Sequence, residues 1–362
     1  MKQQLQTVSV LTLLVLGALA WLQPALAQDI QFSQYNRTPI QVNPAMAGNT
    51  QGKVRLQTAY RNQWSQVLRG DAFNAYLVSA DTRVLEDEKQ ALGLGISGLS
   101  DVAGELSFGS RSLNLSASYQ RKFGASETAV HKLLVGLEAG IANRRIDLTS
   151  ARWPSQHDGN GGFDPTIEVP ITSVPGINPD FSHADINGGL VWQSIYAGGH
   201  SFYLGVAGHH LNKPNVSFFN LVTGEEPEQE TSLSIRYTIH GGSEYSLSAS
   251  WSLISSFLYL NQGEHNSLTL NSSVRKYFGE RGAFKFLQGG VSIRTVNGID
   301  GSIQGSALSP IVNLNLKRFN LGLVVDIPIN ELGDQPIFNG AGELTLGFLF
   351  GSFDERNKTP FF

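Results

Sequence analysis

The sequence predicts an all-β protein: a closed antiparallel transmembrane β-barrel of about 14 strands, with short periplasmic turns and long extracellular loops. From residue 53 onward, segments of roughly ten residues alternate apolar and polar side chains, and clusters of Gly, Asn, Asp and Ser separate them. The composition agrees, because 39 Gly and 10% aromatic residues accompany only 15% charged residues, which favours strands and turns over helical bundles.

A third observation concerns the membrane. After the N-terminal region, no stretch of the sequence is apolar for long enough to cross a bilayer as a helix. Only helices and closed barrels satisfy every backbone hydrogen bond in a bilayer. If the mature chain lies in a membrane, we therefore expect it to be a barrel.

Residues 1–27 are predicted to be a secretory signal peptide. Lys2 is the only charge, an apolar run covers Val8–Leu22, and Ala25-Leu26-Ala27 matches the small-x-small cleavage pattern. The alternative is an N-terminal membrane anchor, but the apolar run is shorter than the ~20 residues of a spanning helix. We expect the mature chain to begin near Gln28 and to reach the outer membrane of a Gram-negative cell.

Residues 28–52 are predicted to be an extended periplasmic lead-in. Pro39 and Pro44 bias the residues before them toward extended geometry, and Gly48-Asn49 suits a tight turn. The segment is polar, aromatic and rich in turn residues, so a helix is not expected there.

Residues 53–350 are predicted to form the barrel. In the first segment Leu56 and Tyr60 share an apolar face, and in another Leu133 and Leu137 do so while Glu138 lies on the opposite face. The same pattern predicts further strands over Ala72–Ala80, Ala91–Leu99, Glu105–Lys122, Asp185–Tyr196, Ser201–Leu211, Thr231–His240, Tyr245–Phe257, His265–Tyr277, Phe284–Thr295, Ala307–Leu316, Phe319–Ile327 and Ala341–Phe350.

Loop lengths are expected to alternate, as in barrels of the outer-membrane type. Short connections are predicted at Ala197–His200, Gly241–Glu244 and Lys317–Arg318, and long ones at Thr149–Ala184, Asn212–Glu230, Val296–Ser306 and Pro328–Gly340. Because short and long connections alternate, both chain ends are expected on the periplasmic side. Residues 351–362, charged in the middle, are predicted to be a periplasmic tail.

The composition excludes several function classes. The formal net charge of −4 gives no support for nucleic-acid binding, and the absence of Cys excludes disulfides, thiolate metal sites and a cysteine nucleophile. The sequence has no nucleophile elbow, phosphate-binding loop, zinc-protease motif or dinucleotide fingerprint. We therefore predict no enzymatic activity and no cofactor. An outer-membrane enzyme with catalytic residues scattered along the sequence is the third alternative.

Two segments have weak metal-binding alternatives. Asp158–Asp164 places oxygen ligands between glycines, as a calcium loop does, but it lacks the bidentate Glu, so a plain surface loop is favoured. His209 and His210 are adjacent on a predicted strand, where neighbouring side chains point to opposite faces. No metal site is predicted.

Aromatic residues gather near the predicted strand ends, as in the girdles at membrane interfaces. The alternative is a stacking surface for sugar. The residues are Tyr60, Trp64, Tyr76, Tyr119, Trp192, Tyr196, Tyr203, Trp251, Tyr259 and Tyr277.

The opening of the mature chain resembles that of the PorP/SprF family of type IX secretion system outer-membrane proteins. The motifs are Gln31-Phe32-Ser33-Gln34-Tyr35, then Asn43-Pro44-Ala45-Met46-Ala47-Gly48, then Tyr60-Arg61-Asn62-Gln63-Trp64. Further similar blocks, such as Leu92–Gly95 with Asp101–Gly104, extend the resemblance over nearly the whole mature chain. Gln66–Asp71 departs from it, because the family often has a proline-rich turn there.

The resemblance implies a Bacteroidota outer-membrane barrel that serves type IX secretion or gliding through protein contacts. Its implied partners are type IX periplasmic or outer-membrane subunits, an exported surface protein with a C-terminal sorting domain, and the lipid bilayer. We hypothesise that Gln31–Gly48 contacts the periplasmic machinery and that loops 149–184 and 212–230 bind the exported protein. The proposed contact residues are Gln31, Phe32, Ser33, Gln34, Tyr35, Asn43, Pro44, Ala45, Gly48, Tyr60, Arg61, Gln63 and Trp64.

A passive diffusion channel is the alternative function. A barrel of about 14 strands can enclose a lumen, and inward side chains or a plug decide whether that lumen is open.

Overall fold

The computed structural model describes most of the chain beyond the signal region, and the statements below concern these residues. They are 29–124, 126, 128–153, 156, 157, 162, 164, 167, 178–218, 232–279, 285–297, 302–330 and 339–351. The predicted signal peptide and all but the first residue of the predicted C-terminal tail lie outside them. So does most of the loop Asp158–Asp164.

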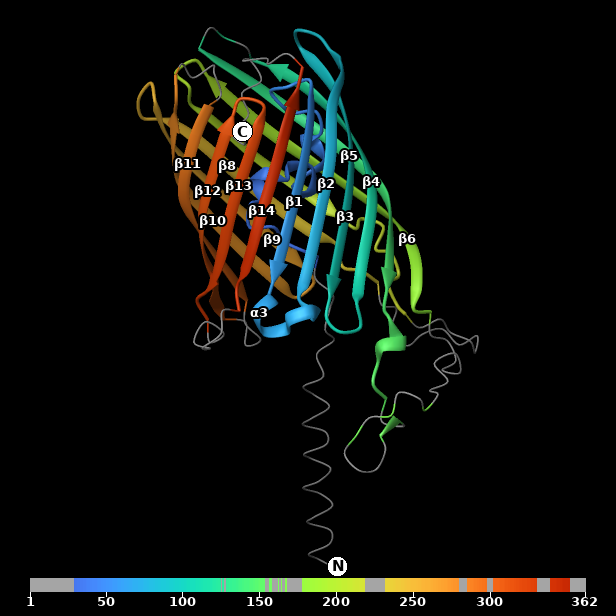
Figure 1. Cartoon of the computed structure of the whole chain (residues 1–362). Coiled ribbons are helices and arrows are strands. Elements are labelled where there is room, and N and C mark those ends of the chain that lie inside the picture. Colours follow the sequence, from blue (N-terminus) through green and yellow to red (C-terminus); the bar gives the residue numbers. More distant parts are fainter. Residues whose placement is uncertain are drawn as a thin grey trace, which may run out of the picture.

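Fourteen antiparallel strands form a closed barrel, as the alternation predicts (Figure 1). Each strand pairs with its neighbours in sequence, and β1 pairs with β14 to close the sheet, so that Val54 lies opposite Phe350. The strands are β1 (Val54–Gln63), β2 (Phe73–Glu86), β3 (Gln90–Ala103), β4 (Phe108–Phe123), β5 (Ala129–Arg145), β6 (Asp180–Tyr196), β7 (Ser201–His209), β8 (Arg236–Ser246), β9 (Trp251–Gln262), β10 (His265–Tyr277), β11 (Lys285–Asn297), β12 (Ile303–Leu316), β13 (Phe319–Pro328) and β14 (Ala341–Phe350).

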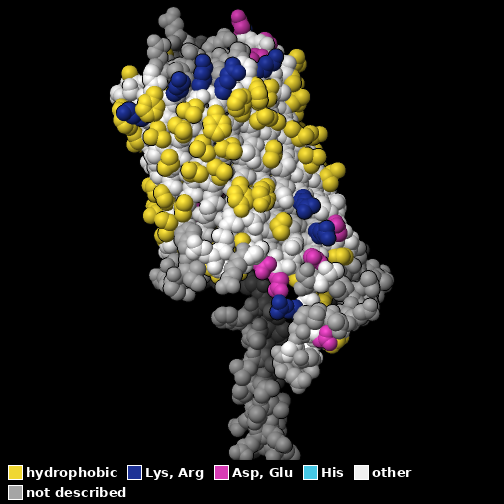
Figure 2. All heavy atoms as spheres, in the orientation of Figure 1, with side chains coloured by type: hydrophobic (Ala, Val, Ile, Leu, Met, Phe, Trp, Pro, Cys, Tyr) yellow, Lys and Arg dark blue, Asp and Glu magenta, His cyan; other side chains and the backbone are white. Residues whose placement is uncertain are grey.

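The outer wall of the barrel is apolar and the inner wall is polar. On β5 Leu133 and Leu137 are exposed, whereas Lys132 and Glu138, which point inward, are 2% and 5% exposed. Apolar side chains cover the visible wall in a broad band (Figure 2). A bilayer favours this outward face, because apolar side chains there meet lipid and the closed sheet leaves no edge unpaired.

The connections define two ends of the barrel. At one end, which we call the short-turn end, residues 197–200 and 317–318 link strands as predicted. At the other, the long-loop end, residues 146–179, 210–235 and 329–340 form the long connections. The connection after β11 covers only 298–302 and is therefore shorter than predicted. The long-loop end also carries two short helical turns after β1, α3 (Ser65–Leu68) and η3 (Arg69–Asp71), and one after β5, η4 (Leu148–Ser150).

Several strand ends were predicted wrongly, including those of β8 and β9, which were expected at Thr231–His240 and Tyr245–Phe257. The segment Gly241-Gly242-Ser243-Glu244, expected to be a turn, lies inside β8, and the turn follows at residues 247–250. A Cβ on Gly241 would press on the ring of Phe257, and one on Gly242 would press on the ring of Tyr203. These glycines are therefore part of the strand because they make room for neighbouring aromatic rings.

The predicted aromatic girdle is correct for part of the set. Tyr76, Tyr119 and Trp251 are well exposed on the outer wall. Tyr203 is 2% exposed and points into the barrel, as does Tyr277, whose hydroxyl donates to Glu244 at 2.5 Å. These two tyrosines belong to the interior.

Candidate functional site: an N-terminal plug inside the barrel

Residues 29–52 lie inside the barrel, where we call them the plug. The segment was expected to be extended and periplasmic, but it folds into three short helical turns enclosed by the strands: η1 (Tyr35–Arg37), α2 (Pro39–Val42) and η2 (Pro44–Met46) (Figure 1). Pro39 and Pro44 each begin a turn, where the missing N–H costs no hydrogen bond. The Asn43 side chain also accepts a hydrogen bond from the Ala45 N–H at 3.0 Å, which caps η2.

The plug runs from one end of the barrel to the other. Asp29 contacts His210 and Arg236, which lie where β7 ends and β8 begins at the long-loop end. The plug leads into β1 at the short-turn end, where the Lys53 N–H donates to the Phe350 carbonyl at 2.9 Å. Asp29, the first residue that the structure describes, therefore lies at the end opposite to the one expected for this segment from the sequence.

Ser33 is the centre of the first contact between plug and wall. Its hydroxyl donates to the carboxylate of Asp326, at 2.7 to 2.8 Å, and accepts from Arg61 at 2.9 Å and from Arg294 at 2.6 Å. A hydroxyl has one proton and two acceptor positions, so this arrangement uses its full hydrogen-bonding capacity.

Glu343 of β14 completes this cluster. Its carboxylate accepts from the backbone N–H groups of Ser33 and Gln34 at 2.7 and 2.8 Å. Arg61 forms ion pairs with Asp326 at 2.8 Å and with Glu343 at 3.4 Å, and the side chains of all three are at most 5% exposed. The barrel wall thus presents buried charges, and plug backbone and hydroxyl groups satisfy part of their hydrogen bonding.

A second contact joins the plug to β1 and β2. Arg55 and Asp81 form a two-pronged ion pair at 2.7 and 2.8 Å, and neither side chain is exposed. Asp81 accepts from the Gly48 N–H at 2.7 Å, and Arg55 donates to the carbonyls of Met46 at 3.2 Å and Asn49 at 3.3 Å. Both members of the pair therefore bind the plug backbone as well as each other.

A third contact depends on close approach between the plug and glycines of the wall. A Cβ on Gly136 would overlap the backbone of Ala45, one on Gly189 would overlap the Asn43 side chain, and one on Gly93 would overlap the Ala47 carbonyl. The strands β3, β5 and β6 therefore form a shallow seat for the plug.

Asn43 anchors the plug in this seat. Its amide nitrogen donates to the carbonyls of Leu190 and Val206, each at 3.1 Å, and lies 3.0 Å from the His240 ring nitrogen Nε2.

A fourth contact fixes the plug at the long-loop end. His210 lies 2.6 Å from Asp29 and 2.8 Å from Asp185, and Arg236 lies 2.8 Å from Asp29. Burial alone would lower the pKa of His210, but the two carboxylates outweigh it and raise this pKa to about 9. Burial alone would raise the pKa of Asp29, but Arg236 and His210 hold it below its ordinary value. Both groups are therefore charged at neutral pH.

The structure brings most of the predicted contact residues together, but they contact the inner wall of the barrel and are not exposed to a partner protein. Phe32 packs with Ala59, Ala75 and Leu77. The nine predicted residues from the plug are Gln31, Phe32, Ser33, Gln34, Tyr35, Asn43, Pro44, Ala45 and Gly48, and all except half-buried Gln31 are buried.

The four predicted residues of the third motif divide between the two faces of the barrel wall. Arg61 points inward to Ser33. Tyr60 stacks on Tyr76 with ring centroids 4.9 Å apart, and Trp64 packs on Phe73 at 4.8 Å. Gln63 is half-buried at the end of β1. Tyr60 and Trp64 are therefore part of the aromatic surface of the barrel.

The sequence analysis missed the partners of the plug on the wall, namely Arg55, Asp81, Asp326 and Glu343. A signal for them exists: each is a charge on the inward face of a strand whose other face is apolar. Charges on an inner wall need water or a buried partner. The polar segment that precedes β1 could supply such partners.

The plug fills much of the lumen. Cavities lined by described residues lie beside it, among them one of about 30 Å³ next to Gln34 and Arg37 and one of about 90 Å³ next to Asp29 and Gln41. These are sizes for a few water molecules. Within the described residues no group of three or more His, Asp or Glu is placed to hold a metal ion, and no helix is long and apolar enough to cross a bilayer.

The closed barrel, its apolar band and its polar, plugged interior define an outer-membrane β-barrel. The family model of the type IX secretion system membrane protein PorP/SprF matches residues 25–348, so the chain belongs to this family. A search of curated proteins finds no match to the sequence.

Solved structures match the chain at low sequence identity. CdiB from Acinetobacter baumannii matches with a TM-score of 0.45 and 8% identity, over 82% of this chain and 60% of that one. The toluene transporter TbuX from Ralstonia pickettii matches with a TM-score of 0.40 and 11% identity, over 86% and 92%. The chain spans about three fifths of the length of the CdiB proteins, and these likenesses concern the fold alone.

Replacing Arg61 by Gln is expected to destabilise the barrel by about 3 kcal/mol or more, because it removes the ion-pair partner of buried Glu343 and leaves buried Asp326 with Arg294 alone, at 3.7 Å. Thermal unfolding in detergent, followed by the loss of the folded band on unheated gels, measures the change. Arg111→Gln is the control, since Arg111 is exposed on β4. An unfolding temperature equal to that of the wild type would contradict the role of the cluster.

Replacing Gly136 by Ala is expected to displace the plug turn at Ala45 and to cost about 1 to 3 kcal/mol through overpacking. Limited proteolysis should then cut within residues 29–52. Gly289→Ala is the matched control, because a Cβ on Gly289 of β11 meets nothing within 4 Å. Equal protection of the plug in both variants would refute the close approach.

The anchor at Asp29 is expected to loosen at high pH. Because the pKa of His210 is raised to about 9 in the folded state, its ion pairs stabilise the plug fully below about pH 6.5, its ordinary pKa, and are lost as the pH rises through about 9. Hydrogen–deuterium exchange of amides 29–33, corrected for intrinsic rates, should increase over this window. The increase should vanish in His210→Gln, and a flat wild-type profile would argue against the anchor.

Proposed function

We propose that the protein is a component of the type IX secretion or gliding machinery that works by binding other proteins while its plug stays in the lumen. The observation that carries this proposal is the combination of a family match over residues 25–348 with a plug that buried charged groups hold against the inner wall. A passive channel needs an open path, and the four plug contacts oppose one.

Two exposed ends are then available for partners. We assign the short-turn end to the periplasmic subunits of the machinery, and the loops 146–179 and 210–235 at the long-loop end to the exported protein with its C-terminal sorting domain. The location in the outer membrane and the removal of residues 1–27 belong to the same proposal. N-terminal sequencing of the purified protein should begin near Gln28.

The expected role of the opening motif, Gln31–Gly48, differs in this hypothesis from the one expected from the sequence. Gln31–Gly48 was assigned to contacts with the periplasmic machinery, and in this conformation its side chains face the wall. A direct contact with the machinery therefore requires the plug to leave the barrel. Locking the plug in place distinguishes the two possibilities.

A disulfide can lock the plug cleanly, because the chain contains no cysteine. A Cβ on Gly95 of β3 would lie 3.4 Å from the Cβ of Ala47, close to the separation in disulfides. We expect the double variant Ala47→Cys, Gly95→Cys to retain secretion after oxidation. Affinity isolation from its own outer membrane, followed by mass spectrometry, should recover the same partners as the unlocked protein.

The single variants Ala47→Cys and Gly95→Cys, treated with the same oxidant, are the controls. Loss of secretion on oxidation, restored by a reductant, would show that the plug has to move and would return the opening motif to the partner interface. Conductance in a planar bilayer that is present in the wild type and absent in the locked form would favour the channel.

A further inference from the structure

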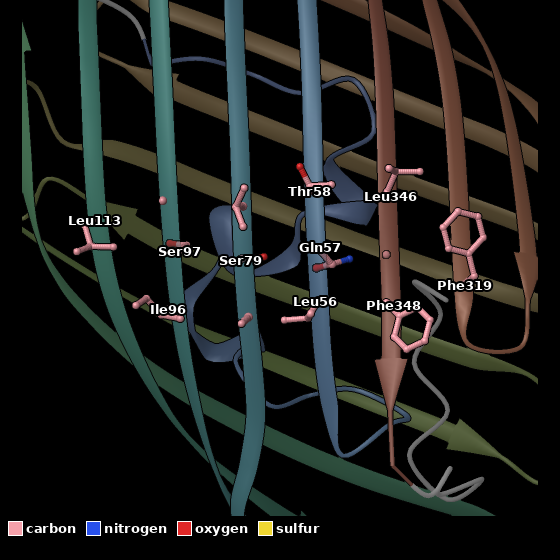
Figure 3. A pocket seen from close by; sticks show the side chains of 14 residues that line it. Leu56, Gln57, Thr58, Ser79, Ile96, Ser97, Leu113, Phe319, Leu346 and Phe348 are labelled. Carbon is pink, nitrogen blue, oxygen red and sulfur yellow. The ribbon is translucent and has the colours of Figure 1, made fainter.

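An apolar groove of about 580 Å³ lies on the outer wall of the barrel, on the membrane-facing side of the seam between β14 and β1 (Figure 3). The register of the strands explains why the groove forms there. One row across the wall runs through Phe348, Leu56, Ala80 and Ile96, and the next row through Leu346, Thr58, Val78, Gly98 and Leu113.

The small residues of the two rows form the floor of the groove. Ala80 lies diagonally next to Thr58 and to Gly98, and Val78 separates these two along their row. Larger side chains such as Phe319 and Leu113 stand at the sides of the groove. Its volume is within the range of sites that hold small organic ligands. Because the groove opens on the apolar band, its occupant has to be apolar there.

Basic side chains stand at the short-turn end of the groove. Lys53 is three residues before Leu56, or roughly 10 Å along β1, and Arg318 directly precedes Phe319. The Lys53 N–H donates to Phe350, and the Leu349 N–H donates to the Arg318 carbonyl at 2.8 Å, so these two residues flank the end of β14.

Lys317 adds a third charge beside them. All three basic residues are exposed, and Lys and Arg side chains form a row beyond the apolar band at this end (Figure 2).

We propose that this groove and its basic end form a binding site for one anionic phospholipid. An acyl chain lies in the groove over Thr58, Ala80 and Gly98, and the headgroup phosphate is bound by Lys53, Lys317 and Arg318. The apolar floor lies deeper in the membrane and the positive charges lie at its surface. A lipid in this leaflet places its acyl chain and its phosphate in the same two positions.

Charge complementarity favours a lipid over a protein segment as the occupant. A transmembrane partner would bury the apolar walls but has no need of three cations at the membrane surface. An anionic headgroup uses both features, and the groove is continuous with the band that contacts the bilayer.

The test is competition between two lipids in nanodiscs that contain equal amounts of phosphatidylglycerol and phosphatidylcholine. Native mass spectrometry counts the lipids that stay bound to the full-length protein. We expect one phosphatidylglycerol to be retained in preference to phosphatidylcholine. The triple variant Lys53→Gln, Lys317→Gln, Arg318→Gln should lower this preference about fivefold or more.

A second variant tests the groove itself. Ala80→Phe fills the floor from the lipid-facing side and should release the retained lipid while the headgroup charges stay. The control Lys89→Gln, Arg121→Gln, Lys276→Gln removes equal charge at the same end of the barrel and should retain the lipid.

Three outcomes would overturn the proposal. They are no preference in the wild type, equal preference in the first triple variant, and equal loss in the two triple variants. Unchanged folding of each variant is checked by the mobility of unheated samples on gels. None of these outcomes bears on whether the barrel serves secretion, so the two hypotheses can fail separately.

Discussion

The buried charges on the inner wall of the barrel are the constraint on which the rest of the structure depends. A closed sheet in a membrane has to direct polar side chains inward, and charges there need water or a partner. Here Arg61 pairs with both Asp326 and Glu343, the Ser33 hydroxyl donates to Asp326, and the Ser33 and Gln34 backbone N–H groups donate to Glu343. The plug is thus part of the core of the molecule, and its polar composition follows from the wall it meets.

The glycines of the inner wall follow from the same constraint. A short segment with helical turns can lie inside a 14-stranded barrel only where the wall leaves room, and β3, β5 and β6 do so at Gly93, Gly136 and Gly189. The outer faces of these strands stay apolar. Each strand therefore meets two requirements at once, a lipid-facing surface on one side and a seat for the plug on the other.

The barrel could be predicted from the sequence, and the plug could not. Most strands were expected near their observed positions, because a wall that faces lipid imposes the same local alternation on every strand. The strand β8 was misplaced because Gly241 and Gly242 look like a turn, whereas two aromatic rings require glycine there. Residues 29–52 gave no comparable pattern.

Their conformation is set by partners far away in sequence. Ser33 bonds to Glu343, and Gln34 accepts from Thr345, across separations of 310 and 311 residues. The motif residues were recognised as a unit by resemblance, but the direction in which they face was not. Strand alternation predicts which residues of the wall point inward. It does not predict which residues of the plug contact them.

The distant partners of the plug also constrain the order of assembly. Ser33 binds side chains of β13 and β14, the last strands to leave the ribosome, while Asn43 binds the carbonyls of β6 and β7. Residues 29–52 have to be in position when β14 pairs with β1, or they have to thread into a closed barrel. Contacts of such long range make folding slow, so either route ties completion of the barrel core to strands that are synthesised last.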